Sequence, residues 1–194
     1  MKKTSYRKEA MLLVTFVTTF LLITTWGYSQ QPEDTKEVAK ERSYEKPDNE
    51  KNEQDSLFLV NAAEASMEQI QLGRLAQQNG TSTHVKELGE KMEDAYNQSL
   101  NDLTALAERK MITIPTSVTD NESYRTLSEK SGDDFDKAYA DLMVSKNEDA
   151  IEAFEKASTD SYDTEIKNWA NTSLSELRKQ QDLAVETQKK CTDM

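Results

Sequence analysis

Few side chains in this sequence are of the types that carry catalysis. The 194 residues include one histidine, His84, and one cysteine, Cys191. A nucleophilic serine or cysteine needs a base, usually histidine, that is held by a third group. His84 has no evident partner, and Cys191 lies close to the C-terminal end. We therefore expect no enzyme activity, and we expect Cys191 to be an unpaired thiol in a frayed tail, with intermolecular disulfide pairing as the alternative.

Metal binding is also poorly supported by the residue types. A di-iron site inside a helical bundle needs inward-facing glutamates and two Glu-x-x-His motifs, but Thr81 stands three residues before His84. We expect His84 to be an exposed residue at the start of a helix. A carboxylate-only site for Ca²⁺ or Mg²⁺ would need clustered, inward-facing acids, and most candidates fall on outer helix faces. These candidates are Glu64, Glu68, Asp94, Glu148 and Glu152. We expect no bound metal and no cofactor.

The composition favours an all-α fold. Hydrophobic residues make up 36% of the chain and charged residues 31%, with only 5 glycines and 3 prolines. Such a mixture suits amphipathic helices better than a deep α/β core or a β fold with many tight turns. The formal net charge is -12. Without a basic patch, nucleic acids and anionic membrane surfaces are poor partners.

The first 29 residues have the pattern of a secretory signal peptide. Basic residues precede an apolar run from Ala10 to Trp26, and small residues follow at Gly27 and Ser29. Cleavage after Ser29 would remove four bases and one acid, so the net charge would move from -12 to -15. The alternative is an uncleaved anchor, but the run is short of the ~20 apolar residues that span a bilayer and contains several threonines. We predict an exported protein, periplasmic or associated with the outer membrane, with no bilayer span after cleavage.

The remaining chain divides into a spacer, a helical domain and a short tail. Residues 30–54 contain almost no large apolar side chains, so we predict a disordered linker. Residues 55–190 should form the domain and residues 191–194 the tail. Apolar side chains recur at spacings of three and four in four long segments, which predicts a four-helix bundle with a short helix in the central crossover. The helices should run from Ser56 to Gln78, from Thr83 to Lys110, from Gly132 onward, and onward from Asp160 or Ser161, either of which could cap the last helix.

Two further patterns concern how the helices pack. Small residues at Ala62, Ser66, Gly73 and Ala76 form a stripe that would allow a neighbouring helix to approach closely. Apolar residues of the second helix also match those of the third at an offset of 51 residues, Met92 with Met143 being one pair. This offset indicates either an internal duplication or the shared period of two bundle helices.

The segment FLVNAAEASMEQIQLGRLAQQNGTSTHVKELGEKM, from Phe58 to Met92, resembles the opening of an uncharacterised bacterial family. Its members are often labelled predicted outer-membrane proteins. Further similar blocks are LTALAERKMITIP, FDKAYADLMV, AIEAFEKAS and DTEIKNWANTSLSELR, so the resemblance covers about residues 56–186. It implies an exported domain with a ferritin-like four-helix bundle, whose biochemical role is not established.

The chain departs from this family where the resemblance implies metal ligands. The expected glutamate of the first helix is Gln69, and the expected histidines of the other three helices are Tyr96, Asn147 and Gln180. We predict that these four side chains meet inside the bundle as a neutral polar cluster, the remnant of a vestigial metal site. Neutral amides can pair with one another, whereas buried carboxylates without a metal are costly to desolvate. The alternative is that each is satisfied separately at the edge of the core.

The sequence therefore predicts a non-enzymatic, exported helical bundle of the cell envelope. Its role would be that of a structural, interaction or stress-related module with an unidentified protein partner. Two alternatives remain: a metal-binding ferritin-like protein, disfavoured by the four replaced positions, and an accessory protein that stays anchored through its N-terminus.

Overall fold

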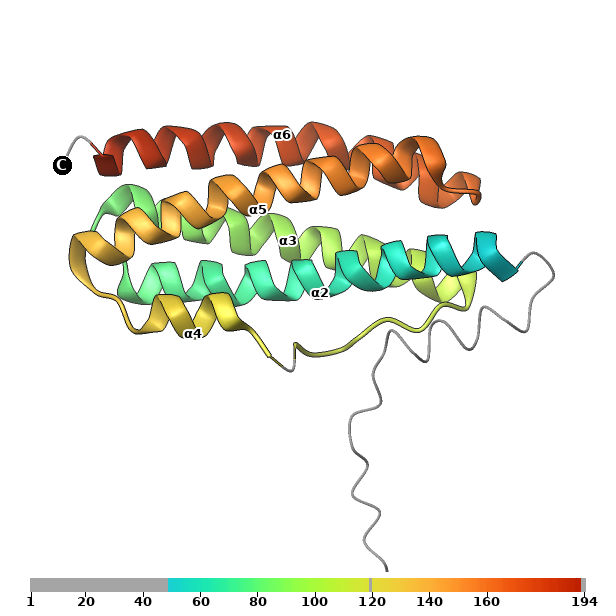
Figure 1. The fold of residues 1–194 in the computed structure, drawn as a ribbon, viewed down its shortest axis with the longest axis horizontal. Coiled ribbons are helices and arrows are strands. Elements are labelled where there is room, and N and C mark those ends of the chain that lie inside the picture. The colour runs from blue at the N-terminus through green and yellow to red at the C-terminus, as the bar shows by residue number, and fades with distance from the viewer. Residues whose placement is uncertain (1–48, 119, 193–194) are drawn as a thin grey trace, which may run out of the picture. The chain divides into compact units, whose positions relative to one another are not determined.

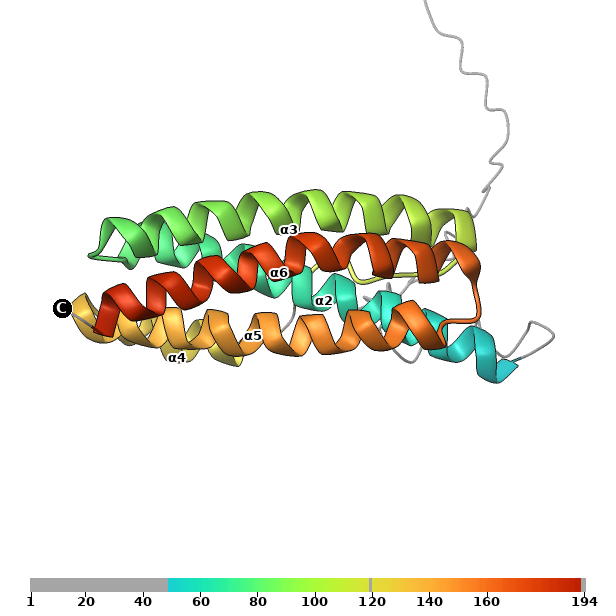
Figure 2. The same cartoon turned by 90° about the horizontal axis from the view of Figure 1, so that it is seen from above.

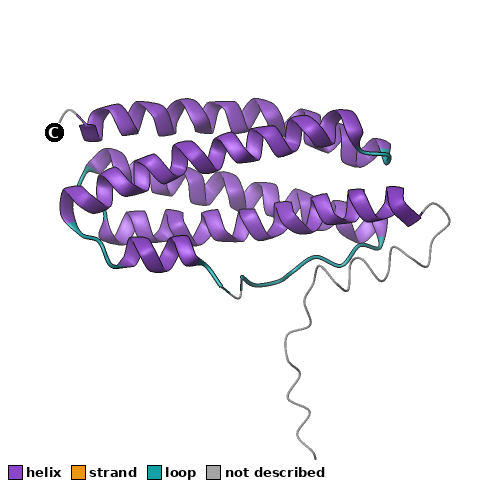
Figure 3. Ribbon diagram, in the orientation of Figure 1, coloured by secondary structure: helices purple, strands orange, loops and turns teal. Residues whose placement is uncertain are grey.

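The computed structural model describes residues 49–118 and 120–192. The predicted signal peptide and most of the predicted linker lie outside the described residues. The helices are α2 (Asn49–Asn79), α3 (Thr83–Lys110), α4 (Glu122–Ser128), α5 (Gly132–Asp160) and α6 (Thr164–Thr192). This part of the chain contains no strand, which confirms the all-α prediction (Figure 3). None of its helices is long and apolar enough to cross a membrane.

Two antiparallel hairpins make up the bundle (Figures 1 and 2). Helix α2 packs along α3, and α5 packs along α6; the hairpins then meet through α3 against α6 and α2 against α5. After α3, the chain returns along the bundle, so that α5 begins at the end where α3 began (Figure 1). The predicted short helix is α4, which packs against α2 and α5 during this return. The fold is a helical bundle with one long crossover, as expected.

Three predicted boundaries differ from the structure. Residues 49–54 belong to α2 rather than to the linker, because this helix begins at Asn49. Helix α6 is capped by Asp163, not by Asp160 or Ser161: Asp163 Oδ1 accepts the N–H groups of Glu165 at 2.9 Å and Ile166 at 3.2 Å. Ser161 instead ends α5, where its N–H donates to the Ala157 carbonyl.

The prediction of a frayed tail at Cys191 is wrong. Helix α6 continues to Thr192, and Cys191 is only 1% exposed. The two helices of the second hairpin are equally long, so the last turn of α6 packs near the first turn of α5. Burial raises the pKa of the Cys191 thiol, and the nearby carboxylates of Asp136 and Asp141 raise it further.

A close approach of α2 and α3 explains part of the small-residue stripe. A Cβ atom added to Gly73 would lie 2.6 Å from the Gly89 carbonyl oxygen, and one added to Gly89 would lie 2.7 Å from the Gly73 carbonyl oxygen. Only glycine at both positions permits this separation of the two backbones. The predicted close approach therefore occurs at Gly73, with Gly89 as a partner that the sequence analysis did not identify.

Each hairpin turn is held by a buried aspartate from the other hairpin. Asp136 of α5 accepts the N–H groups of Thr81 at 2.9 Å and Ser82 at 2.6 Å, in the turn between α2 and α3. We call these contacts, together with their counterpart at the other end, the carboxylate latches.

The counterpart is Asp55 of α2. It accepts the N–H groups of Tyr162 at 3.1 Å and Asp163 at 2.7 Å, in the turn between α5 and α6. Burial raises the pKa of the Asp55 carboxyl, an effect that the two backbone N–H donors oppose. The two aspartates are 5% and 0% exposed for Asp55 and Asp136. A shift of 81 residues carries one latch onto the other, donors included.

We expect Asp136→Ala and Asp55→Ala each to lower the free energy of unfolding by about 1–3 kcal/mol, since two backbone donors lose a charged acceptor. For a domain of this size the melting temperature should fall by about 2–4 °C per kcal/mol. Asp55→Asn should cost less than Asp55→Ala, because the amide keeps one acceptor. The matched control is Asp94→Ala on the exposed face of α3. Equal melting temperatures for the latch variants and the control would contradict the latch role.

Burial of Cys191 should protect it from alkylation. We expect the thiol to react with iodoacetamide at least ten times more slowly in the native protein than in urea, where the last turn of α6 is unfolded. Mass spectrometry of timed samples measures the modified fraction. Equal rates in the two conditions would mean that the end of α6 is open in solution.

Candidate functional site

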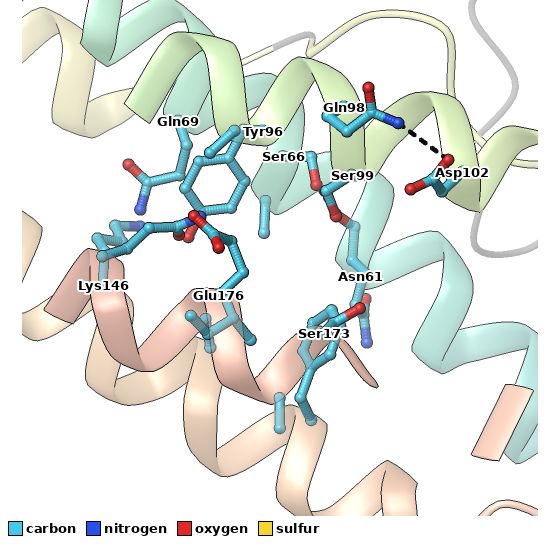
Figure 4. Close-up of a pocket in the computed structure, with 18 of the residues that line it drawn as sticks. Asn61, Ser66, Gln69, Tyr96, Gln98, Ser99, Asp102, Lys146, Ser173 and Glu176 are labelled. Atoms are coloured by element: carbon cyan, nitrogen blue, oxygen red, sulfur yellow. Dashed lines mark hydrogen bonds between the residues drawn. The ribbon is translucent and has the colours of Figure 1, made fainter. Parts of the chain in front are cut away.

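A cavity of about 490 Å³ lies between the two hairpins (Figure 4). All four long helices contribute to its lining, whereas α4 does not. Exposed lining residues lie on both sides of the bundle. Ala65, Asp149 and Ala153 lie along α2 and α5, and Gln98, Asp102, Thr172 and Glu176 lie along α3 and α6. The hairpins are tightly packed within themselves and more sparsely packed against each other, which leaves this space between them.

The four residues of the predicted polar cluster lie at or beside this cavity. All are buried: Gln69, Tyr96 and Gln180 are 3%, 5% and 6% exposed, and Asn147 is fully buried. Gln69, Tyr96 and Gln180 line the cavity. Asn147 does not line it, but its Oδ1 accepts the Tyr96 hydroxyl at 3.3 Å. The structure therefore brings together the side chains that the resemblance aligned with metal ligands.

The hydrogen bonds of this cluster run in one direction. Asn147 donates its Nδ2 to the Met143 carbonyl at 2.8 Å, which leaves its Oδ1 to accept from Tyr96. The Tyr96 oxygen in turn takes a hydrogen bond from the Gln69 side chain, one that favours the phenolate and so comes from the amide nitrogen. Because the Gln69 nitrogen is used in this way, its oxygen is turned elsewhere.

Two acceptors are left without partners at the cavity. Among the residues that the structure describes, Gln69 Oε1 and Gln180 Oε1 are buried and have no hydrogen-bond partner. A buried polar atom without a partner costs about 1–3 kcal/mol. Both side chains line the cavity, so a molecule that offers hydrogen-bond donors there would relieve this cost.

The cluster does not suit a metal ion. Burial raises the pKa of the Tyr96 hydroxyl, and the same holds for Tyr139, so neither supplies a phenolate near neutral pH. Amides and a neutral phenol are weak ligands beside the carboxylates and imidazoles of bundle metal sites. Within residues 49–118 and 120–192, no group of three or more His, Cys, Asp or Glu residues could hold a metal. No chemistry is therefore assigned to a metal at this site.

The acids considered for a cation site are spread apart. Asp94, Glu148 and Glu152 are exposed, and Glu64 is half-buried. Glu68 does line the cavity, where both of its carboxylate oxygens lie 3.0 Å from Lys146 Nζ. His84 is exposed at the start of α3, and its backbone N–H donates to Ser82, as a residue of a helix N-terminus does.

The other end of the cavity is aromatic. The ring centroid of Phe58 lies 5.1 Å from that of Phe154 and 5.8 Å from that of Trp169, and the Phe154 and Trp169 centroids are 5.1 Å apart. We call these three the aromatic triad. In Figure 4, Gln69, Tyr96, Lys146 and Glu176 lie toward one side of the pocket, and Asn61, Ser66, Ser99 and Ser173 toward the other.

The sequence analysis missed the cavity itself. It assigned Ala62 and Ser66 to a close helix contact, but these two residues line the cavity. Small side chains also face it from the other helices, with Ala95 on α3 and Ala150 on α5. Small residues on all four helices at one height of the bundle were the available signal, but single-helix periodicity does not reveal which heights coincide.

A comparison with sequence families finds one match, to a domain of unknown function (DUF4142), over residues 40–187. No curated protein and no solved structure matches the chain. The matched region includes every cavity-lining residue.

We expect Tyr96→Phe to lower the free energy of unfolding by about 1–2 kcal/mol, because the Asn147 oxygen loses its donor and the Gln69 amide loses its acceptor while both remain buried. Chemical denaturation followed by circular dichroism measures the change. Tyr124→Phe is the matched control, since Tyr124 is 37% exposed and should be unaffected. If the two variants were equally stable, the Tyr96 hydroxyl would not hold the cluster together.

Proposed function

We propose a function on the premise that this chain belongs to the DUF4142 family, whose match spans residues 40–187. We infer that it is a non-catalytic, exported bundle of the bacterial cell envelope that acts by binding. The ferritin-like description of the fold is part of this proposal and is supported by the single long crossover between two hairpins.

One observation carries the proposal. At the centre of the bundle, where the resemblance implies metal ligands, a neutral set of hydrogen-bonded side chains lines a cavity with two unpartnered acceptors. Catalytic sites usually contain titratable groups with pKa values tuned to the reaction. Here the buried phenols have raised pKa values and the amides do not titrate, so the site is suited to holding a molecule rather than transforming it.

Export is supported by the sequence of residues 1–29. Their basic start, apolar run and small residues before the expected cleavage point match a signal peptide. A periplasmic or outer-membrane-associated location agrees with the names given to members of the family that the sequence resembles. An uncleaved N-terminal anchor is the second candidate, and it predicts the same bundle tethered to a membrane.

In a bacterial expression host, we expect the protein in the periplasmic fraction with an intact mass that begins at Gln30. Leu21→Arg, which places a charge in the apolar run, should retain the chain in the cytoplasm at full length. Recovery of the unaltered protein in the membrane fraction with residues 1–29 attached would favour the anchored alternative. Full-length protein in the cytoplasm would overturn export.

Metal analysis separates the binding proposal from the ferritin-like alternative. We expect less than about 0.1 iron, manganese or zinc ion per purified chain, because amide and phenol side chains replace the carboxylate and imidazoles of bundle metal sites. A variant with Gln69→Glu, Tyr96→His, Asn147→His and Gln180→His provides the comparison and should gain metal-dependent thermal stability. A stoichiometric metal in the unaltered protein would overturn the proposal.

A further inference from the structure

The cavity is long, and its two ends differ in chemistry. Gln69 follows Phe58 by eleven residues on α2, and Gln180 follows Trp169 by eleven residues on α6. At 1.5 Å per helical residue, the unpartnered amide oxygens lie about 16 Å along the bundle from the aromatic triad. Helices α2 and α6 run in the same direction (Figure 1), so the amide end and the aromatic end are shared by both.

The amide end requires donors. Gln69 Oε1 and Gln180 Oε1 are buried acceptors without partners, within side chains that are 3% and 6% exposed. A carboxylate offers no donor, and a single hydroxyl offers one. An ammonium group offers three donors and needs no acceptor filled in return, so one such group could serve both oxygens.

The charge along the cavity also favours a cation. Four carboxylates line it, and Lys146 is the basic residue among the lining side chains. Lys146 is already engaged with both oxygens of Glu68. The other three acids are Asp102, Asp149 and Glu176, which leave the cavity with a negative excess that attracts cations and repels anions.

The aromatic end requires an apolar body. Phe58, Phe154 and Trp169 form a cluster of packed rings at this end, and Ala62, Ala150 and Leu177 add apolar surface to the lining. Ligand pockets of this kind bury an apolar body against such side chains and fix its orientation through a few polar groups. A small polyamine without a hydrocarbon body would leave the aromatic end unused.

From these observations we propose that the cavity binds an alkylammonium amphiphile, a protonated primary amine on an extended hydrocarbon chain. The ammonium group donates to Gln69 Oε1 and Gln180 Oε1, and the chain extends toward the aromatic triad. This binding does not depend on whether the protein is exported. It gives the two unpartnered oxygens, which otherwise only destabilise the bundle, a role in recognition.

The test compares four probes on the purified protein by titration calorimetry, below the concentrations at which the probes form micelles. They are dodecylamine, dodecanol, dodecanoate and spermine. We expect saturable binding of one dodecylamine per chain, with affinity at least tenfold above that for dodecanol and spermine and no binding of dodecanoate. A change in Trp169 fluorescence should accompany dodecylamine binding, because this ring lies at the apolar end of the cavity.

Two variants connect the binding to the amide oxygens. Gln180→Met and Gln69→Met keep the length of the side chain but remove the oxygen. Gln180→Met should weaken dodecylamine binding at least tenfold while leaving the melting temperature equal or higher, since an unpartnered buried acceptor is lost. The matched control is Gln78→Met on the exposed surface of α2, which should bind normally.

Four results would overturn the proposal. They are the absence of dodecylamine binding, equal or tighter binding of dodecanol or dodecanoate, equal binding of spermine, and unchanged affinity in Gln180→Met at unchanged stability. Tighter dodecanoate binding would assign the cavity to anionic lipids. Equal spermine binding would assign the interaction to the acidic surface instead.

Discussion

The arrangement of the two hairpins depends on the carboxylate latches. Asp136 and Asp55 each reach from one hairpin into the turn of the other and accept two backbone N–H groups. Helical hairpins pack through side chains that could slide by a turn, whereas a buried carboxylate that chelates two backbone donors fits only one register. One latch at each end of the bundle therefore fixes how the hairpins align, and with it which residues of α2, α3, α5 and α6 face the cavity.

The latches also reveal a symmetry that the cavity breaks. The shift of 81 residues that relates them carries the end of α2 onto the end of α5, and Thr83, the first residue of α3, onto Thr164, the first residue of α6. The same shift pairs Gln69 with Ala150 and Tyr96 with Leu177. A large polar side chain on one hairpin thus corresponds to a smaller or apolar one on the other. The two halves share a frame, but the cavity and its one-directional hydrogen bonds belong to the differences between them.

The sequence predicted the elements of the fold better than their contacts. Helix α3 was placed at its observed bounds because Ser82 and the apolar period mark it clearly, and Tyr96, Asn147 and Gln69 were placed together through a family resemblance. The offset of 51 compares α3 with α5, which run in the same direction, so it matched heights in the bundle; the relation between hairpins is the shift of 81. The latch aspartates, the Gly89 contact and the burial of Cys191 depend on which segments meet in space, and a helical period within one segment carries no such information.

The centre of the bundle is less stable than its residues could make it. Two apolar side chains in place of Gln69 and Gln180 would remove the buried unpartnered oxygens at no cost in volume, and such replacements are among the easiest routes to added stability. The tight Gly73–Gly89 contact and the latches show that packing elsewhere in the bundle is well satisfied. A polar centre that is costly for folding, adjoins a cavity and points acceptors in one direction is best explained by the molecule that it holds.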